Sequence, residues 1–230
     1  MKIITTPLLV ATLLSTALLA GCSISPIETP VINSYGILPS QSDATDTKQM
    51  QQNKKTIIYI AEMTATNPYD TTQIFYSKST YQIQAYNYNQ WMAPPANMLT
   101  NVLTQHFNHS KNVLAVSGNY IGSSQLRLTT RLNSLIQDFT QSGTSTNVVL
   151  NITAIATNSN SGVTLETKNF IVNVMAAPNP LGMVKATNEA TNKMVIEIAN
   201  WIQKVKIPVT KNQETSNQEP SKVIHNNVPL

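Results

Sequence analysis

The sequence predicts an α/β fold of the α+β sandwich type: a single mixed, largely antiparallel sheet with two long helices packed on it, flanked by disordered tails. Strand patterns cluster between residues 56 and 175, two apolar helical stripes accompany them, and polar segments without apolar periodicity stand at both ends. A hydrophobic content of 41% is enough for one core. The 87 Asn, Gln, Ser and Thr residues among 230 supply most of the polar surface.

Four short strands are expected in the first half of the fold. Thr56–Met63 is a β-branched and aromatic run that ends before an Asn-Pro pair typical of turns. Gln73–Tyr76 and Tyr81–Tyr86 follow as a hairpin-like pair. Val113–Ser117 is the fourth, and it comes after the first helix.

Three long strands are expected in the second half. In Leu126–Ile136, apolar and small residues alternate strictly with Arg, Thr and Asn, which predicts one covered face and one wet face. Asn147–Thr157 and Val163–Met175 continue the sheet. The polar segment Asn158–Gly162 between them predicts a compact turn.

Two helices are expected to cover one face of this sheet. A Pro-Pro pair at 94–95 opens the first, since proline is tolerated in the first turn of a helix. The second spans Val184–Val205 and ends before Pro208. Their apolar stripes are Met98, Leu99, Val102, Leu103 and Phe107 in the first, and Ala190, Met194, Ile198 and Ile202 in the second.

Residues 1–21 have the layout of a secretory signal peptide. One lysine, Lys2, precedes an uncharged apolar run that small residues close. The ending Leu-Ala-Gly-Cys resembles the bacterial lipobox, in which cleavage between Gly21 and Cys22 leaves the cysteine to receive a diacylglycerol and an N-acyl chain such as palmitate. The alternatives are plain secretion and a transmembrane helix, for which about 20 apolar residues suffice.

The lipobox and the local composition together predict the organisation of the chain. Residues 22–54 are the lipidated cysteine and a polar tether with one short strand at Tyr35–Leu38, residues 55–207 are the folded domain, and residues 208–230 are a disordered tail. Several acyl chains form a stable anchor because each buried CH₂ contributes about 0.8 kcal/mol. By the sorting pattern of such signals, Ser23 implies the outer membrane, with the protein on its periplasmic face.

Charge and motifs exclude several functional classes. The net charge is only +4 and the basic residues are spread out, which argues against nucleic-acid binding. A single cysteine excludes a disulfide framework and a thiolate-rich metal site. His106 and His109 have a spacing that could hold a metal, but without a third ligand nearby a helix-end pair is expected. No nucleophile elbow, P-loop or dinucleotide fingerprint occurs. We therefore expect no catalytic residue, no metal and no cofactor besides the acyl chains on Cys22.

Aromatic residues crowd into one segment that could contact a partner protein. The candidates are Tyr76, Tyr81, Tyr86, Tyr88 and Trp91. Tyrosine and tryptophan combine apolar area with a polar group, as contact surfaces require, and the alternative is packing in the core or at a sheet edge. Arg127 and Arg131, which share a strand face, are further candidates, with ordinary solvated positions as the alternative.

Short motifs follow one another along about residues 33–205. They are Tyr35-Gly36-Ile37-Leu38-Pro39, Tyr69-Asp70, Gln73-Ile74-Phe75-Tyr76, Trp91-Met92-Ala93-Pro94, Gln125-Leu126-Arg127-Leu128, Ile136-Gln137-Asp138-Phe139, and Ala190 with Asn192. Their order resembles the ABC-type transport auxiliary lipoproteins, the PqiC-like family linked to mammalian-cell-entry (MCE) lipid transport systems.

The resemblance implies a non-enzymatic auxiliary component of a lipid transport system between the membranes. Its partners would be an MCE-type periplasmic protein and that protein's ABC transporter, and a homo-oligomer is compatible with it. The alternatives are a periplasmic lipid- or glycolipid-binding carrier and a surface-exposed host-interaction lipoprotein. A carrier needs an apolar cavity on the order of hundreds of Å³. The apolar stripes are just sufficient to close the fold, so we expect no stoichiometric phospholipid.

Overall fold

The computed structural model describes residues 30–39, 56–110, 113–139 and 146–208. The predicted signal peptide, Cys22, most of the tether and the C-terminal tail lie outside these residues. Within the described part of the chain, no helix is long and apolar enough to cross a membrane. The sheet and both helices belong to the unit that begins at Asn33.

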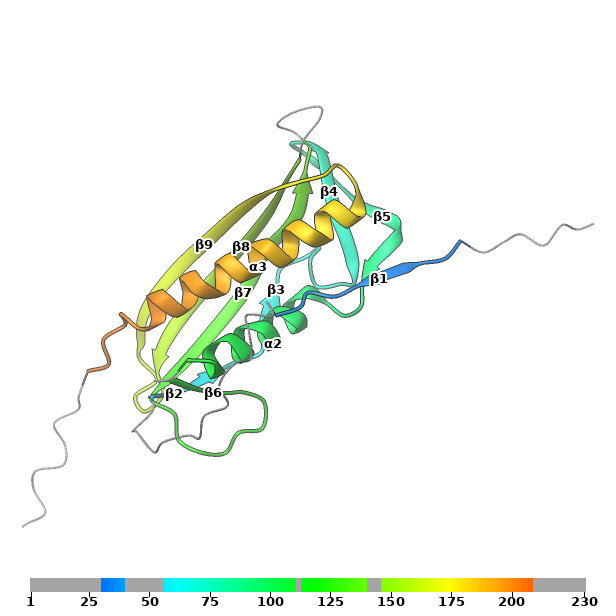
Figure 1. The fold of residues 1–230 in the computed structure, drawn as a ribbon. Helices are drawn as coiled ribbons and strands as arrows, with labels where there is room; N and C mark the ends of the chain where they lie inside the picture. Colours follow the sequence, from blue (N-terminus) through cyan, green and yellow to red (C-terminus); the bar gives the residue numbers. More distant parts are fainter. Residues whose placement is uncertain (1–29, 40–55, 111–112, 140–145, 209–230) are drawn as a thin grey trace, which may run out of the picture. The chain divides into compact units, whose positions relative to one another are not determined.

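The described residues form one mixed sheet of nine strands with two helices packed on it, which confirms the predicted fold class (Figure 1). The strands are β1 (Asn33–Tyr35), β2 (Thr56–Ile60), β3 (Thr64–Ala65), β4 (Gln73–Ser79), β5 (Gln82–Trp91), β6 (Val113–Val116), β7 (Leu126–Asp138), β8 (Thr146–Asn158) and β9 (Thr164–Ala176). The helices are α2 (Pro95–Asn108) and α3 (Pro180–Ile202).

Strand β7 is the centre of the sheet. Along one edge it pairs with β8, which pairs with β9, and these long ladders are antiparallel. Along its other edge it pairs in succession with β2, β3 and β4, all parallel to it. β6 extends the sheet beyond β2, while β5 and then β1 extend it beyond β4. One long strand therefore organises all the short ones.

The run predicted as one strand, Thr56–Met63, is shorter in the structure. β2 ends at Ile60, the Ala61 N–H still donates to the Leu128 carbonyl of β7 (3.0 Å), and pairing with β7 resumes at Thr64. In between, the Met63 N–H donates to Oγ1 of Thr100 in α2 (2.9 Å). A helix side chain thus takes a backbone donor that a continuous strand would have offered to its neighbour in the sheet.

An extra residue in β7 changes which side chains enter the core. Asn133 forms a β-bulge, because the residues on either side of it pair with consecutive residues of β8. Before it the even-numbered side chains are buried, whereas after it Leu135 and Gln137 are buried and Ser134 and Ile136 are not. The strict alternation predicted for this strand is therefore wrong beyond the bulge, since a one-residue shift exchanges the two faces.

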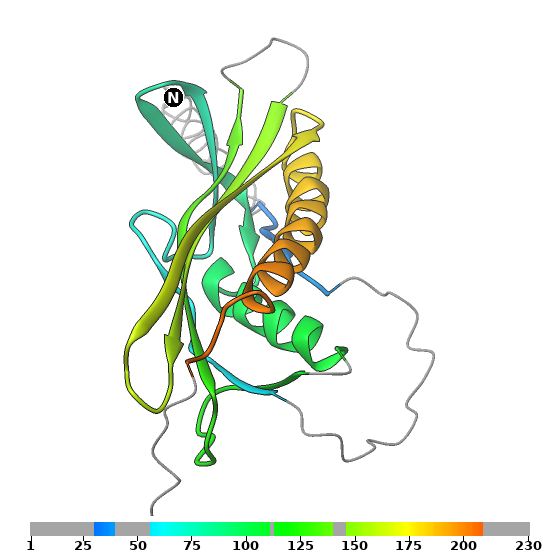
Figure 2. The ribbon, with the colours of Figure 1, turned by 90° about the vertical axis from the view of Figure 1, so that its left-hand side faces the viewer.

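Both helices lie on the same face of the sheet (Figure 2). α3 packs on β8 and β9, and α2 packs on β6 and α3. Every predicted member of the two apolar stripes is buried. α3 begins at Pro180, four residues before its predicted start, because Oδ1 of Asn179 accepts a hydrogen bond from the Gly182 N–H (2.7 Å) and caps the helix.

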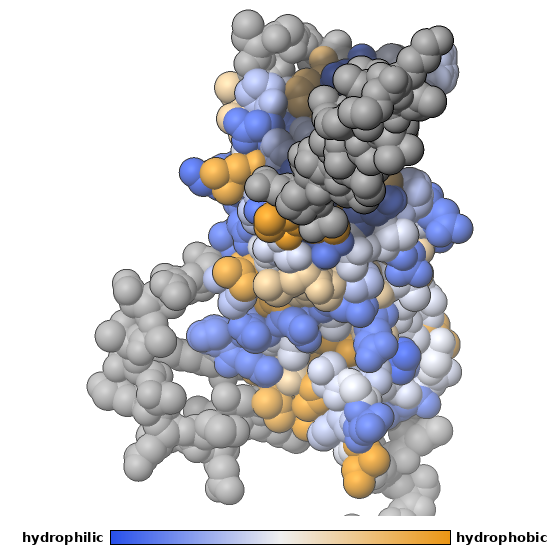
Figure 3. Space-filling model, turned by 90° about the vertical axis from the view of Figure 1, so that its right-hand side faces the viewer, coloured by the Kyte–Doolittle hydropathy of each residue, from blue (hydrophilic) through white to orange (hydrophobic). Residues whose placement is uncertain are grey.

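Among the described residues, no helix covers the other face of β7, β8 and β9, here called the open face (Figure 2). It consists of Arg127, Thr129, Arg131 and Asn133 of β7 with the odd-numbered residues of β8 and the odd-numbered residues of β9 from Thr167 onward. At its centre, Nδ2 of Asn133 lies 2.7 Å from Oγ1 of Thr153 and 3.0 Å from Oδ1 of Asn151. Elsewhere, on the side shown in Figure 3, hydrophobic residues form separate patches among hydrophilic ones.

Candidate functional site

Four of the predicted contact residues lie together on the hairpin of β4 and β5. We call Tyr76, Tyr81, Tyr86 and Tyr88 the tyrosine cluster. Tyr81 is in the turn between the strands and is 99% exposed, and Tyr88 is 52% exposed. Tyr76 and Tyr86 are half-buried, with ring centroids 4.6 Å apart. Lys78 places Nζ 5.7 Å from the centroid of the Tyr76 ring. The hairpin therefore presents both a rigid ring pair and two exposed tyrosines.

A buried amide holds the tyrosine cluster in place. The Tyr86 hydroxyl donates to Oε1 of Gln137 (2.8 Å), whose side chain is fully buried. Nε2 of Gln137 donates to Oγ1 of Thr146 (2.6 Å) and to the carbonyl of Ala177 (2.8 Å). Burial, with a further contribution from Tyr76, raises the pKa of Tyr86 to about 12. Tyr86 is therefore a neutral hydrogen-bond donor at physiological pH.

A surface hollow of about 560 Å³ borders the cluster. Its lining is Tyr76, Gln84, Ala85, Tyr86, Asn87, Tyr88 and Asn89. These side chains offer hydroxyl and amide groups together with aromatic area, and none of them carries a charge at neutral pH. Such a surface suits docking of a polypeptide segment better than acid–base chemistry.

Trp91 does not share the surface of the tyrosine cluster. It is the last residue of β5, is 1% exposed, and pairs with Tyr35 of β1. Its backbone N–H donates to the carbonyl of Thr72 (2.7 Å). For this residue the structure favours core packing, the alternative to a partner contact.

Arg127 and Arg131 are both exposed on the open face. The Arg127 guanidinium lies 4.8 Å from the ring centroid of Tyr59, its neighbour in β2. Nε of Arg131 donates to Oδ1 of Asn133 (3.1 Å). A second hollow adjoins Arg127, lined by Tyr59, Tyr120, Gly122, Ser123, Ser124, Arg127, Ser159 and Asn160.

The arginines do not join the tyrosine cluster. Tyr76 pairs with Gln137, six residues along β7 from Arg131 and ten from Arg127. At about 3.3 Å per residue these intervals are roughly 20 and 33 Å. Gln137 is buried on the helix side, whereas the arginines are on the open face. The structure thus divides the predicted contact residues between two places.

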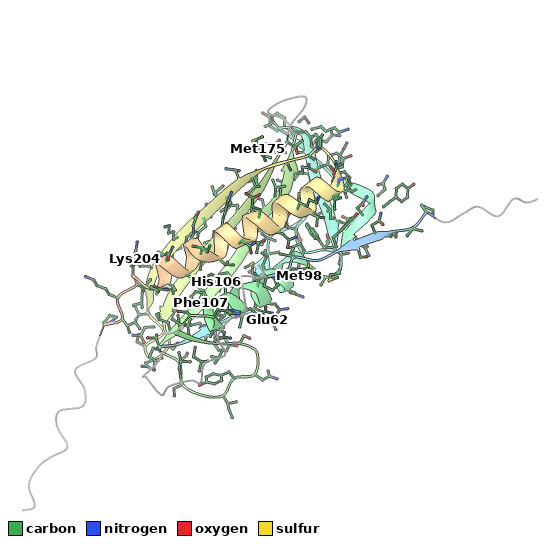
Figure 4. The ribbon with its side chains drawn as sticks, viewed as in Figure 1. Glu62, Met98, His106, Phe107, Met175 and Lys204 are labelled. Carbon is green, nitrogen blue, oxygen red and sulfur yellow. The ribbon has the colours of Figure 1, made fainter. Side chains whose placement is uncertain are left out.

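Within the described ranges, no three His, Cys, Asp or Glu side chains are grouped so as to hold a metal ion. His106 lies next to Phe107 in α2 (Figure 4), and burial, with a smaller contribution from His109, lowers its pKa. Nδ1 of His109 is 2.7 Å from the carbonyl of Gln105 at the helix end. This geometry fits the predicted helix-end pair.

Sequence patterns did not predict the roles of two polar residues, Gln137 and Asn188. The bulge at Asn133 reverses the alternation of buried and exposed residues before Gln137. The sequence pattern contains no sign of the bulge, so it places Gln137 on the solvent face. Asn188 of α3 bonds to the backbone of Gly36 and Leu38. Asn188 lies outside the predicted apolar stripe of α3, so the sequence carries no signal for its role.

Comparison with known proteins gives a family and a fold. A sequence model of the family described as ABC-type transport auxiliary lipoprotein component matches residues 37–199. A crystal structure of a Xanthomonas campestris protein assigned to the DUF330 family has a TM-score of 0.59 and 14% identity, and covers 76% of this chain and 94% of its own. A crystal structure of an uncharacterized protein gives 0.58 and 14%, with coverages of 75% and 99%. No curated protein matches. At this identity the two structures show a common fold.

The family match spans most of the sheet and of both helices, and it supports the resemblance that the short motifs indicated. The family description joins two properties, a lipoprotein's attachment to a membrane and an association with an ABC transport system. On this evidence the protein belongs to the family of ABC-type transport auxiliary lipoprotein components.

Proposed function

We propose that the protein is a non-enzymatic auxiliary component of an MCE-type lipid transport system, anchored in the outer membrane and facing the periplasm. The observation that carries this proposal is the family match over residues 37–199. The lipobox-like ending at Gly21 and Cys22 supports acylation of Cys22 as the anchor. Ser23 supports the outer membrane as the destination.

Two of the described acidic side chains have structural partners, which supports a non-enzymatic role. Oε2 of Glu166 accepts a hydrogen bond from Nε1 of Trp201 (2.9 Å), which ties β9 to α3. Glu189 forms an exposed i,i+4 pair with Lys193 (2.7 Å). A general acid or base must reach a substrate in a cleft. Glu166 instead joins β9 to α3, and Glu189 pairs with a residue of its own helix, so both carboxylates are structural groups.

The open face and the hollows support a protein component over a lipid carrier. A carrier encloses an acyl chain in an apolar cavity. Both hollows described above are lined mainly by hydroxyl and amide side chains. The open face carries two arginines and a hydrogen-bonded Asn and Thr network, which would be costly to bury against hydrocarbon. We therefore expect native mass spectrometry of the domain, made without signal and Cys22, to show no bound phospholipid.

Within this proposal, the tyrosine cluster contacts the MCE-type periplasmic protein. Tyr81 and Tyr88 are exposed, and the Tyr76 and Tyr86 rings, 4.6 Å apart and tilted by 37°, lie on the same hairpin. Binding energy in protein interfaces concentrates in a few tyrosines, tryptophans and arginines. Arg127 and Arg131, on the other face, are a separate candidate contact.

A pull-down of the acylated protein from detergent-solubilised envelopes tests the proposed function. Recovery of an MCE-type protein and an ABC transporter is expected, and their absence would refute the transport role. The double variant Tyr81→Ser/Tyr88→Ser should weaken recovery about tenfold, which corresponds to about 1.4 kcal/mol. Tyr120→Ser, a tyrosine 37% exposed beside the other hollow, is the matched control. Equal recovery for both variants would exclude the tyrosine cluster as the contact.

The anchor is tested by Cys22→Ala. This variant should lose palmitate label and leave the outer-membrane fraction, because no other cysteine is present to take a diacylglycerol. Unchanged label and unchanged membrane recovery would refute acylation at Cys22.

A further inference from the structure

Residues Asn33–Leu38, here called the strap, are the part of the predicted tether that packs on the folded domain. The strap begins as β1, which pairs in parallel with the end of β5. Its Tyr35 carbonyl accepts a hydrogen bond from the Met92 N–H (2.8 Å). Ile37 is 4% exposed, and its N–H lies 3.4 Å from Sδ of Met98, which is in the first turn of α2 (Figure 4). The strap is therefore held on the sheet side and on the α2 side.

Asn188 of α3 fixes the strap from a third direction. Its Oδ1 accepts a hydrogen bond from the Leu38 N–H (2.8 Å), and its Nδ2 donates to the Gly36 carbonyl (3.2 Å). The same Nδ2 lies 3.0 Å from the carbonyl of Val184 in the preceding turn of α3. One side-chain amide thus satisfies two backbone groups of the strap.

Exposed apolar side chains gather beside this strap. Leu38 is 62% exposed and Met92 is 63% exposed. A Cβ on Gly36 would lie 3.2 Å from Cδ2 of Leu38 and 3.3 Å from Sδ of Met92, so the two side chains meet over the glycine. Leu181, two turns before Asn188 on α3, is 50% exposed. Seven residues are about two helical turns, so Leu181 lies on the same side of α3 as Asn188, roughly 10 Å along the helix. We call Leu38, Met92 and Leu181 the strap patch.

We propose that the strap patch rests on the surface of the membrane in which Cys22 is anchored. This inference rests on the proposed acylation of Cys22. Ten residues separate Cys22 from Asn33. Because an extended chain spans at most about 3.6 Å per residue, the strap begins within roughly 40 Å of the anchor. A tether this short keeps the patch at a high effective concentration near lipid, so a weak apolar contact is sufficient to orient the domain.

The charge beside the strap patch suits a lipid surface. Lys185 is exposed on the turn of α3 that follows Leu181. Basic side chains at an interface are attracted to anionic headgroups, while leucine and methionine side chains enter the boundary of the acyl region. The open face also carries basic side chains, but the strap is the described segment that follows Cys22 most closely in the chain. This short connection places the strap side toward the membrane.

Quenching of site-specific labels tests this orientation. Acylation blocks the only native thiol, so Met92→Cys and Leu38→Cys each carry a single reactive cysteine. The matched control is Ile171→Cys, which is 54% exposed on the open face of β9. The acylated proteins are labelled with a fluorophore and reconstituted into phosphatidylethanolamine–phosphatidylglycerol vesicles. We expect aqueous iodide to quench the labels at 38 and 92 several-fold less than the label at 171, and brominated lipid to quench them more.

Each outcome separates this orientation from the anchor itself. Equal quenching at 92 and 171 in proteins that float with the vesicles would overturn the inference and leave the anchor intact. Failure to float would overturn both. The label at position 92 could also be protected from iodide in a soluble form without Cys22 as strongly as in the vesicle-bound protein. That result would show that protein, for example a second copy of this chain, covers the patch, and it would overturn the inference.

Discussion

The amide of Gln137 should contribute measurably to stability, and Gln137→Leu tests this. The side chain is fully buried and makes three hydrogen bonds, to the Tyr86 hydroxyl, to Oγ1 of Thr146 and to the carbonyl of Ala177. Leucine has a similar volume, so the substitution removes hydrogen bonds without leaving a large cavity. Oγ1 of Thr146 keeps its bond to the carbonyl of Ala176 (3.1 Å). The Tyr86 hydroxyl and the Ala177 carbonyl lose a partner.

The environment of these two groups sets the magnitude. A fully buried polar group left without a partner costs about 1–3 kcal/mol. Tyr86 is half-buried, so water can reach its hydroxyl and the lower end of that range, about 1 kcal/mol, applies to it. The Ala177 carbonyl keeps the hydrogen bond from the Asn179 N–H (2.8 Å) and loses one ordinary hydrogen bond, which contributes about 1 kcal/mol. The expected loss in the free energy of unfolding is therefore about 2 kcal/mol. For a domain of this size that corresponds to a fall in Tm of roughly 4–8 °C.

Urea and thermal unfolding followed by circular dichroism measure this loss. Gln82→Leu is the matched control, because Gln82 is exposed on β5 and should change the unfolding free energy by less than about 0.5 kcal/mol. A double-mutant cycle with Tyr86→Phe should give a coupling of about 1 kcal/mol. A loss at Gln137 no larger than that at Gln82, or additive effects of the Tyr86 and Gln137 changes, would refute the network.

Two further predictions concern pH. The pKa of Tyr86 is raised from 10.0 to about 12, so its neutral form is favoured in the folded state; the stabilisation is complete below pH 10 and lost as pH rises to about 12. A near-ultraviolet titration of Tyr86→Phe should therefore lack a late-ionising tyrosine that the native protein shows. Burial lowers the pKa of His106, so its stabilisation is complete above pH 6.5 and lost as the pH falls through the folded value. Urea midpoints below pH 6.5 should fall less for His106→Gln than for His109→Gln, and equal falls would contradict this.

Local pattern predicted the helices and the antiparallel ladders well. Apolar residues at helical spacing require a covered face, and every predicted stripe residue of α2 and α3 is buried. The two long strands predicted at Asn147–Thr157 and Val163–Met175 correspond to β8 and β9 within one residue at each end, and each has one face under α3. The parallel pairing of β2, β3 and β4 with β7 was not predicted, since parallel register depends on contacts distant in sequence.

The bulge at Asn133 limited prediction of the site. Period-2 alternation holds only while strands pair residue for residue, and one unpaired residue in β7 exchanges the faces that follow. Gln137 therefore enters the core although the pattern places it outside. Trp91 shows a second limit of prediction from sequence. An aromatic-rich segment does not indicate which of its rings becomes buried. The pairing of Trp91 with Tyr35 depends on a strand 56 residues earlier in the chain.

β5 connects the two proposed surfaces. Its last three residues, Asn89–Trp91, pair with β1 of the strap, and its earlier residues carry Tyr86 and Tyr88 of the tyrosine cluster. Tyr88 directly precedes the paired segment, and its carbonyl accepts a hydrogen bond from Nδ2 of Asn33 (3.4 Å). Because a paired strand moves as a unit, an orientation imposed through the strap is transmitted to the tyrosines without a flexible joint. Tyr86 lies three residues from Asn89, roughly 10 Å along the strand. A partner that binds the tyrosine cluster must therefore approach the membrane that holds the strap.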